Sequence, residues 1–380
     1  MRKIIGILLT LCLLLPAAFA EEEELSLLDL VGGNGTEVVT GLETAEDAES
    51  GPEETVELVE ETTGIRTITA TFAGDFTIGA DCRKSTNIYE DELEKQGGDI
   101  NFPMRNIRDI LLEDDLTLVN FEGTLTNSTY IPDNKKENSF LFSAPPEYVS
   151  ILPDNGIEAV SLENNHVMDH GEEVYLETQQ HLTDAGVVWS NAETIGVYTV
   201  KGVEIAMLSY QTFDMYDTLF TQVPLDVAEA KAKYPLVIVS FHWGAEKDYA
   251  PNSNQQKMGK MAIDAGADLV VGHHSHRINP IEEYNGKYIV YSLGNFCFAG
   301  NTKPDDMSSF LFQIRWRVTD TDITQEGFRI IPIRISSRTD YNDFAPTVLE
   351  KETAIDGLLS TLKENGRKLD NPVSEYPLEW

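Results

Sequence analysis

The feature that most restricts the fold is an alternation of short apolar runs with helical patterns. Six β-rich apolar runs, each followed by polar or glycine residues, have the composition and length of buried strands. Helical patterns at residues 104–113, 172–185 and 254–265 separate them, which predicts an α/β fold with helices on the sheet faces. Lys201-Gly202 and Asn285-Gly286 are typical of hairpin turns, so part of the sheet should be antiparallel. The six runs are residues 68–73, 116–121, 157–162, 236–241, 269–271 and 288–293.

The first twenty residues have the pattern of a secretory signal peptide. Arg2 and Lys3 precede an apolar run at residues 4–15, and small residues lead to Ala20, after which we expect cleavage. The run is shorter than the roughly 18 residues that a spanning helix needs, and no later run is longer. The protein is therefore predicted to be secreted or extracytoplasmic. It would contact a membrane only through this segment, if the segment stays uncleaved.

The rest of the chain divides by composition. Residues 21–65 contain fifteen acidic residues and no Lys or Arg, which predicts a disordered acidic spacer. Residues 66–340 lack a repeat of fixed period and are predicted to form one domain. Residues 341–380 are more polar and are predicted to be a peripheral C-terminal tail, with one helix near 354–364.

The charge balance argues against polyanionic partners. The chain has 28 Lys and Arg against 64 Asp and Glu, a net charge of −36, and loss of Arg2 and Lys3 with the signal makes this −38. Such a charge opposes binding to nucleic acid or anionic lipid, except at a locally positive spot such as a bound metal. After cleavage Cys82 and Cys297 remain, either as a disulfide, which export permits, or as two free buried thiols.

Potential ligands follow five of the predicted strands. Open α/β sheets place functional residues at the carboxyl ends of strands, where loops converge on one crevice. Each residue alone has an ordinary explanation, such as a turn cap, a solvated loop or a core histidine, but the ordered set predicts a metal site. The residues are Asp75, Asn120, Glu122, Asn165, His166, His242, His273, His274 and His276.

These residue types suit hydrolytic metal chemistry. A carboxylate that bridges two cations offsets their repulsion, imidazoles and an amide oxygen complete the coordination, and a water in a remaining position has its pKa lowered toward 7. A nearby imidazole such as His166 can protonate a leaving group. The mixed nitrogen and oxygen set favours one or two ions of Mn, Fe or Zn over Ca.

The motifs around these residues resemble those of a known family. Over residues 67–298 the chain resembles the capsule-synthesis proteins associated with poly-γ-glutamate production, which are related to calcineurin-like metallophosphoesterases. The motifs are Gly74-Asp75-Phe76-Thr77-Ile78-Gly79, Asn120-Phe121-Glu122-Gly123, Asn164-Asn165-His166-Val167-Met168-Asp169-His170-Gly171, His242-Trp243-Gly244-Ala245-Glu246, Gly272-His273-His274-Ser275-His276 and Tyr291-Ser292-Leu293-Gly294-Asn295-Phe296.

The resemblance implies a four-layer α/β/β/α sandwich and a role at the cell envelope in making, exporting or anchoring a γ-linked glutamate polymer. A polymer-synthesis or export complex is then the expected partner. The implied roles are carboxylate ligands for Asp75 and Glu122, an amide ligand for Asn165, an acid or water-orienting group for His166, and imidazole ligands for His242, His276 and one of His273 or His274.

The chain departs from the metallophosphoesterase pattern at two places. That pattern begins Asp-x-His, whereas Thr77 occupies the histidine position here. The number of metal ions at the site, one or two, therefore stays open. The Gly-His-x-His motif has gained a residue, so that either His273 or His274 is the ligand. Glu163 is predicted to add a carboxylate or to form a salt bridge at the strand end. Glu246 and Asn295 are predicted either to support the ligands or to make capping and loop hydrogen bonds.

The sequence therefore favours an exported metal-dependent protein of capsule or poly-γ-glutamate biosynthesis with a hydrolase-like site. One alternative is a non-catalytic scaffold for polymer export or anchoring that keeps the fold and the weakened site. A second alternative is a secreted phosphodiesterase or nucleotidase unrelated to the polymer.

Overall fold

The computed structural model describes residues 64–136 and 139–380. The predicted signal peptide, and all but the last two residues of the predicted acidic spacer, lie outside the described residues. Among the helices that the structure does describe, none combines the length and the apolar character needed to cross a membrane.

The first sheet has eight strands, with a parallel half and an antiparallel half. The strands β1, β2, β5 and β6 run parallel, whereas β14, β15 and β16 run antiparallel to their neighbours. In spatial order they are β16 (Thr347–Val348), β15 (Ile323–Arg334), β14 (Ser308–Val318), β1 (Arg66–Thr77), β2 (Leu116–Phe121), β5 (Ala159–Ser161) and β6 (Val188–Ser190), and β13 (Asn295–Phe298) also pairs with β1.

The second sheet has six strands around a parallel centre. Its two outer pairs are antiparallel, and both predicted hairpin turns are confirmed, because Lys201 and Asn285 adopt φ of 50° and 51° before their glycines. The spatial order is β11 (Ile281–Tyr284), β12 (Lys287–Val290), β10 (Leu269–His273), β9 (Leu236–His242), β8 (Val203–Gln211) and β7 (Gly196–Val200), and a separate pair is β3 (Thr124–Leu125) with β4 (Ser143–Ala144).

Six α-helices connect these strands in the described part of the chain. The patterns at 172–185 and 254–265 are confirmed as α3 and α5, whereas only residues 108–112 of the pattern at 104–113 form an α-helix. Asn252 begins α5 with a reciprocal capping box, which satisfies two otherwise free backbone donors. The helices are α1 (Ile88–Lys95), α2 (Arg108–Leu112), α3 (Glu172–Asp184), α4 (Tyr216–Lys233), α5 (Ser253–Asp264) and α6 (Glu352–Gly366).

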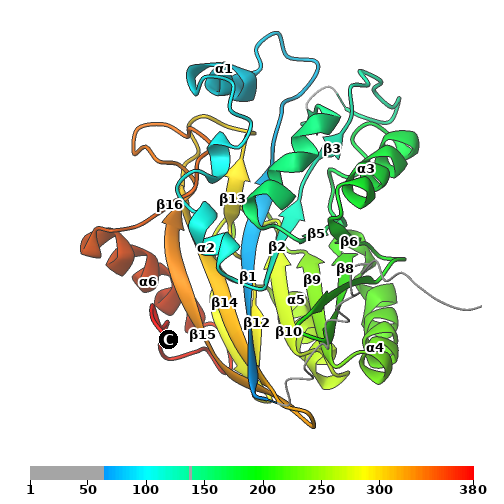
Figure 1. The fold of residues 1–380 in the computed structure, drawn as a ribbon, viewed down its shortest axis with the longest axis vertical. Coiled ribbons are helices and arrows are strands. Elements are labelled where there is room, and N and C mark those ends of the chain that lie inside the picture. Colours follow the sequence, from blue (N-terminus) through cyan, green and yellow to red (C-terminus); the bar gives the residue numbers. More distant parts are fainter. Residues whose placement is uncertain (1–63, 137–138) are drawn as a thin grey trace, which may run out of the picture. The chain divides into compact units, whose positions relative to one another are not determined.

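Three clusters of buried apolar residues define four layers. On β9, Leu236 and Ile238 belong to the cluster between the two sheets, whereas Val237 and Val239 belong to the cluster under α4 and α5. This alternation follows from the two-residue period of a strand. The third cluster joins the outer face of the first sheet to α1, α2 and α3. The four-layer α/β/β/α sandwich is therefore confirmed (Figure 1).

The segment predicted to be a peripheral tail packs closely on the domain. Leu358 and Leu362 of α6, together with Tyr376, are buried in the cluster between the sheets. In Figure 1 α6 lies beside the half of the first sheet formed by β14 and β15. The ring of Trp380 contacts Arg315, whose guanidinium carbon lies 3.9 Å from the ring centroid. The C-terminal residues thus complete part of the core.

The two cysteines are not bonded to one another. Cys82 is exposed, whereas Cys297 is buried and its thiol donates a hydrogen bond to the carbonyl oxygen of Phe344. The disulfide is therefore absent, and the alternative of two buried thiols is wrong for Cys82.

Candidate metal centre

The parallel strands of both sheets bring the predicted ligands together. Glu122 directly follows β2, and His242 and His273 are the last residues of the neighbouring strands β9 and β10, where they pair with each other. Asp75 is different, because β1 continues to Thr77 and carries Asp75 inside the strand rather than after it. The predicted strand end at residue 73 was therefore too early.

A close approach of two strands holds Asp75 in place. The Asp75 amide donates to the carbonyl oxygen of Gly294 at 3.0 Å, and Asp75 pairs with Asn295 of β13. A Cβ atom at Gly74 would lie only 1.9 Å from that same oxygen. Since no side chain fits there, glycine at position 74 allows β13 to approach β1 beside the site.

The two carboxylates are fully buried. Asp75 Oδ1 accepts a hydrogen bond from Asn120 Nδ2 at 2.8 Å, and its Oδ2 lies 3.1 Å from His276 Nδ1. Among the described residues, neither carboxylate oxygen of Glu122 has a hydrogen-bond partner. Ligand atoms of Asp75, Glu122 and His276 all lie within 4.8 Å of one another. Buried carboxylate oxygens without partners are unfavourable unless a cation joins them, so this donor set fits a metal ion.

Asn165 and His242 lie next to this trio. His242 Nε2 is 2.7 Å from Asn165 Oδ1 and 3.9 Å from Glu122 Oε1. Its other nitrogen lies 3.3 Å from Asn120 Nδ2. The predicted amide and imidazole ligands are therefore adjacent to one oxygen of Glu122, the carboxylate predicted to bridge.

Both His273 and His274 reach the cluster. The ring of His274 lies 4.6 Å from that of His242 and 6.2 Å from that of His276. Its buried Nδ1 has no hydrogen-bond partner in the part of the chain that the structure describes. His273 is completely buried, and its Nδ1 is 3.7 Å from Asp75 Oδ1. Neither of its ring nitrogens has a hydrogen-bond partner within residues 64–136 and 139–380. The choice between the two as ligand stays open.

An uncommon backbone path brings these histidines together. His274 and His276 have φ of 89° and 52°, a region that residues other than glycine rarely adopt. Strain of this kind concentrates at functional sites, where the surrounding structure maintains it.

Burial keeps three of the imidazoles neutral. Desolvation lowers the pKa of His242 well below its usual value and lowers the pKa of His273 and of His274 to about 4. Desolvation also lowers the pKa of His276, but the nearby Glu122 and Asp75 outweigh it and raise that pKa to about 10. Neutral imidazoles are the form that binds metals. In the metal-free protein a proton on His276 supplies positive charge that a cation would otherwise provide.

Burial also acts on the carboxylates. It raises the pKa of Glu122 to about 7, and repulsion from Asp75 adds to this effect. Burial raises the pKa of Asp75 too, but the hydrogen bond from His276 outweighs it and the net pKa is lowered. The two carboxylates thus differ in charge near neutral pH, and a bound cation would favour the ionised form of both.

His166 lies at the edge of the cluster in a fixed orientation. Its Nδ1 is 2.7 Å from Asp169 Oδ2, and its Nε2 is 3.9 Å from Glu122 Oε1. Asp169 is itself held by the Phe142 amide and by Lys135 Nζ, each at 2.8 Å. The orienting role of Asp169 was not inferred from the sequence, although its spacing of three residues from His166 was a usable signal.

The other motif residues take different positions. Asn295 Oδ1 lies 2.8 Å from Nδ1 of His276, a predicted ligand, and this contact agrees with the first of the two roles predicted for Asn295. Asn164 holds the motif by donating to the carbonyl oxygen of Phe121 at 2.8 Å. Glu163 accepts from the Ala192 amide at 3.1 Å and forms no ion pair with the residues that the structure describes.

Thr77 stands at the histidine position of the Asp-x-His pattern, and no imidazole is supplied from there. Its side chain is fully buried, and its hydroxyl has no hydrogen-bond partner within the described ranges. The imidazole that does lie beside Asp75 belongs to His273.

Comparison with known proteins agrees with the motifs. The fold and the cluster define an α/β sandwich protein with a metal-type ligand set at the carboxyl ends of its strands. Residues 69–300 match the family described as bacterial capsule synthesis protein PGA_cap, and the chain belongs to this family.

Two relatives come from Bacillus. The PGA biosynthesis protein CapA of Bacillus subtilis is 31% identical over 283 residues, which cover 67% of this chain and 72% of that protein. The capsule biosynthesis protein CapA of Bacillus anthracis is 28% identical over 272 residues, which cover 65% of this chain and 64% of that protein. The chain thus matches less than two thirds of the second relative.

Solved structures of more distant proteins also align. A phosphatase from Mycoplasma pneumoniae aligns with a TM-score of 0.44 and 14% identity, over 71% of this chain and 95% of that one. The calcineurin-like phosphoesterase YfkN of Bacillus subtilis aligns with a TM-score of 0.40 and 13% identity, over 80% and 98%.

Proposed function

We propose that this chain is an exported, metal-dependent protein with a hydrolase-like site that acts in poly-γ-glutamate capsule biosynthesis. The observation that carries the proposal is the pair of unpartnered, fully buried oxygens of Glu122 among other potential ligands. A carboxylate placed in this way is stabilised when ionised by a bound cation, and in the metal-free protein by protons on Glu122 itself or on His276. Membership of the capsule-synthesis family supplies the biological context.

The donor set suits one or two ions of Mn, Fe or Zn. Asp75, Glu122 and His276 would hold one ion, and Asn165 and His242, with His273 or His274, would add a second beside Glu122. When bound, such ions supply Lewis acidity and lower the pKa of a coordinated water.

His166 would act as the acid or as the group that orients water. Asp169 fixes its Nδ1, so that Nε2 remains free on the side of Glu122. An imidazole held in this way can give a proton to a leaving group at the ligands.

Export and assembly are parts of the proposal that rest on the sequence. The pattern of residues 1–20 supports export, and the acidic composition of residues 21–65 supports a tether that separates the domain from the cell surface. The proposed partner is a polymer-synthesis or export complex at the cell envelope.

Metal analysis of the purified protein tests the site. We expect the wild type to retain a transition metal, and Asp75→Ala and His242→Ala to lose most of it. Asp320→Ala and His181→Ala are matched controls, because these residues lie outside the cluster, and they should bind metal like the wild type. A wild-type protein that takes up no transition metal, even after incubation with Mn, Fe or Zn salts, would sink the proposal.

A non-catalytic scaffold is the second candidate, and Thr77 favours it. A site that lacks one imidazole of the metallophosphoesterase pattern can retain binding while losing turnover. The His166→Ala variant separates the two: unchanged polymer output in the cell, without detectable phosphodiesterase activity in the wild type, would select the scaffold. Strong turnover of generic phosphate esters, with normal polymer in a deletion strain, would instead select a secreted phosphodiesterase or nucleotidase.

A further inference from the structure

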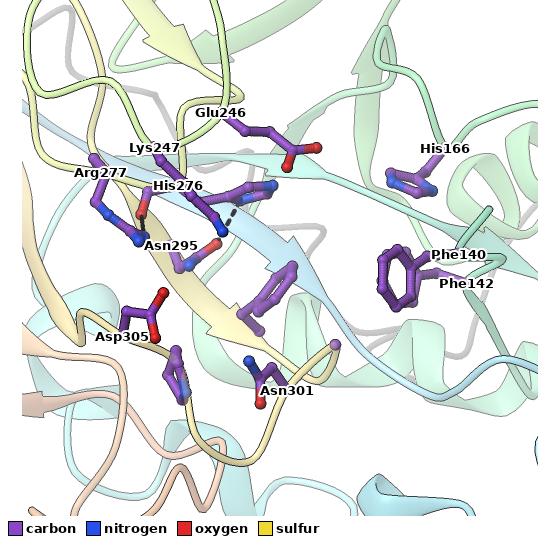
Figure 2. A pocket seen from close by; sticks show the side chains of 13 residues that line it. Phe140, Phe142, His166, Glu246, Lys247, His276, Arg277, Asn295, Asn301 and Asp305 are labelled. Atoms are coloured by element: carbon purple, nitrogen blue, oxygen red, sulfur yellow. Dashed lines mark hydrogen bonds between the residues drawn. The ribbon is translucent and has the colours of Figure 1, made fainter. Parts of the chain in front are cut away.

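A cavity of about 350 Å³ lies directly beside the candidate metal ligands. His166, His276 and Asn295 line it, and in Figure 2 His166 lies apart from the other two, beside Phe140 and Phe142. Its size is near the lower end of the range for small-molecule pockets. A molecule bound in the cavity would therefore be in reach of the residues proposed to hold the metal.

Arg277 brings an unneutralised positive charge to this cavity. The residue follows His276 directly, and only 7% of its surface is exposed. Its Nη1 donates to the carbonyl oxygen of His276 at 2.8 Å, and its guanidinium lies 5.7 Å from the ring centroid of Tyr249. Arg277 forms no ion pair with any carboxylate of the described residues. A guanidinium stays charged, and its burial is offset best by an anion, a role that a ligand with a carboxylate or phosphate group could fill here.

Lys247 adds a second cation at the same cavity. Its amide donates to the carbonyl oxygen of Ser275 at 2.7 Å, and its φ of 68° lies in the left-handed region. The loop after β9 is therefore held against the loop that carries Arg277. Within the described chain Lys247 also has no ion pair, and Figure 2 shows it on the same side of the cavity as Arg277.

Two carboxylates also line the cavity, and neither forms an ion pair with these cations. Glu246 lines the cavity and forms no ion pair within the described residues, and Figure 2 shows its carboxylate there. Asp305 is exposed and forms no ion pair within the described residues. In a chain with net charge −36, Arg277 and Lys247 are thus two cations at one cavity whose charges no ion pair within the described residues occupies.

Part of the remaining lining of the cavity is aromatic. Phe142 and Phe298 pack edge to face with ring centroids 6.1 Å apart. Phe142 also contacts His166, and Phe298 contacts His276, at 4.6 and 5.0 Å. A ligand that fits must therefore carry both an anionic group and a short apolar part, and it must extend toward the ligands.

We propose that this cavity is a carboxylate subsite for a γ-linked glutamate chain. Arg277, assisted by Lys247, binds the α-carboxylate of one glutamate unit, because the planar guanidinium matches a carboxylate with two parallel hydrogen bonds. The methylene groups of that unit lie on Phe142 and Phe298, and the adjoining bond of the chain lies at the metal ligands. The inference rests on the proposed function and names its specificity-determining residue.

Binding to metal-free protein tests the subsite separately from catalysis. Calorimetric titration of the full chain in the presence of a chelator, with a γ-linked glutamate trimer as the probe, should give measurable affinity. Arg277→Gln should weaken binding about tenfold or more, as expected for loss of a hydrogen-bonded charge pair. Arg277→Lys should recover part of the loss. Arg317→Gln is the matched control, because Arg317 pairs with Thr67 near the start of β1, and it should bind the trimer like the wild type.

A change in the ligand keeps the test valid if Arg277→Gln perturbs His276. The same trimer with its α-carboxylates converted to amides should bind the wild type as weakly as the acidic trimer binds the variant. The two losses should not add when both changes are combined. Metal content of Arg277→Gln should equal that of the wild type, which separates a specificity role from damage to the ligands.

Three results would overturn the subsite. The first is no binding of the trimer to the wild type at millimolar concentration, and the second is equal affinity of the acidic and amidated trimers. The third is inorganic phosphate binding through Arg277 more tightly than the trimer does, which would assign the cavity to a phosphate group. A failure of metal binding or turnover would refute the proposed function and leave the titration result intact.

Discussion

The close approach at Gly74 leads to a quantitative prediction. A Cβ atom in Gly74→Ala would lie 1.9 Å from the carbonyl oxygen of Gly294, whereas ordinary contact begins at 3.4 Å, so the oxygen must move by about 1.5 Å. Overpacking of this kind costs about 1–3 kcal/mol, and the hydrogen bond from the Asp75 amide to this oxygen is worth about 1 kcal/mol more. The free energy of unfolding should therefore fall by about 2–4 kcal/mol.

Gly357 supplies the matched control for this substitution. It lies exposed in α6, and a Cβ atom there would meet no other atom within 4 Å. Gly357→Ala should therefore stabilise the protein by about 0.5–1 kcal/mol, because alanine loses less backbone entropy in a helix. Urea unfolding of both variants in the presence of a chelator measures the two changes, and the dependence on urea concentration should be unchanged.

The same substitution should also weaken metal binding. Moving Gly294 displaces Asn295, which contacts His276, and shifts Asp75 relative to Glu122. Affinity for Mn or Zn should fall about tenfold or more, as is usual when groups that orient ligands are displaced. If the free energy of unfolding of Gly74→Ala lies within about 0.5 kcal/mol of the wild-type value, the reasoning from strand contact is refuted.

Three further predictions concern charge, orientation and thiol chemistry. Burial raises the pKa of Asp114 to about 7. The stability that its protonated form contributes is therefore complete below its unfolded pKa near 4 and is lost as the pH rises through 7. The free energy of unfolding of Asp114→Asn, measured by heat or urea, should equal that of the wild type at about pH 4 and exceed it by about 2 kcal/mol at about pH 8, allowing for partial exposure. Asp169→Asn should lower kcat about 10-fold to 100-fold with unchanged metal content, because it frees the His166 ring, and equal kcat would contradict that role. In the folded protein a thiol reagent should modify Cys82 and leave the buried Cys297 unmodified until unfolding, as mass spectrometry of the labelled peptides would show.

Much of the fold and of the cluster followed from local sequence patterns. The strand at residues 116–121 was predicted with its observed bounds, and α3 and α5 were placed within a residue at each end. Buried parallel strands have continuous apolar composition, and their polar ends mark the crevice, so Glu122 and His242 could be recognised without coordinates.

What the sequence could not provide depends on contacts between distant segments. Asp75 lies inside β1 because β13, more than two hundred residues later, pairs with it. The alternating strands β14 and β15, which form much of the first sheet, carry no ligands and were not predicted. The proximity of Lys247 to Arg277 depends on one backbone hydrogen bond to Ser275, which no local pattern encodes.

The packing of α6 affects how the phenotype of a truncating mutation in this protein should be interpreted. The apolar cluster between the two sheets includes three residues that lie well beyond the last motif, Leu358, Leu362 and Tyr376. A nonsense mutation near residue 350 would leave the codons of all predicted ligands intact and yet expose that apolar cluster to water. The shortened product should be cleared by proteases or aggregate, so a null phenotype from such an allele would report lost folding and say nothing about the chemistry at Glu122.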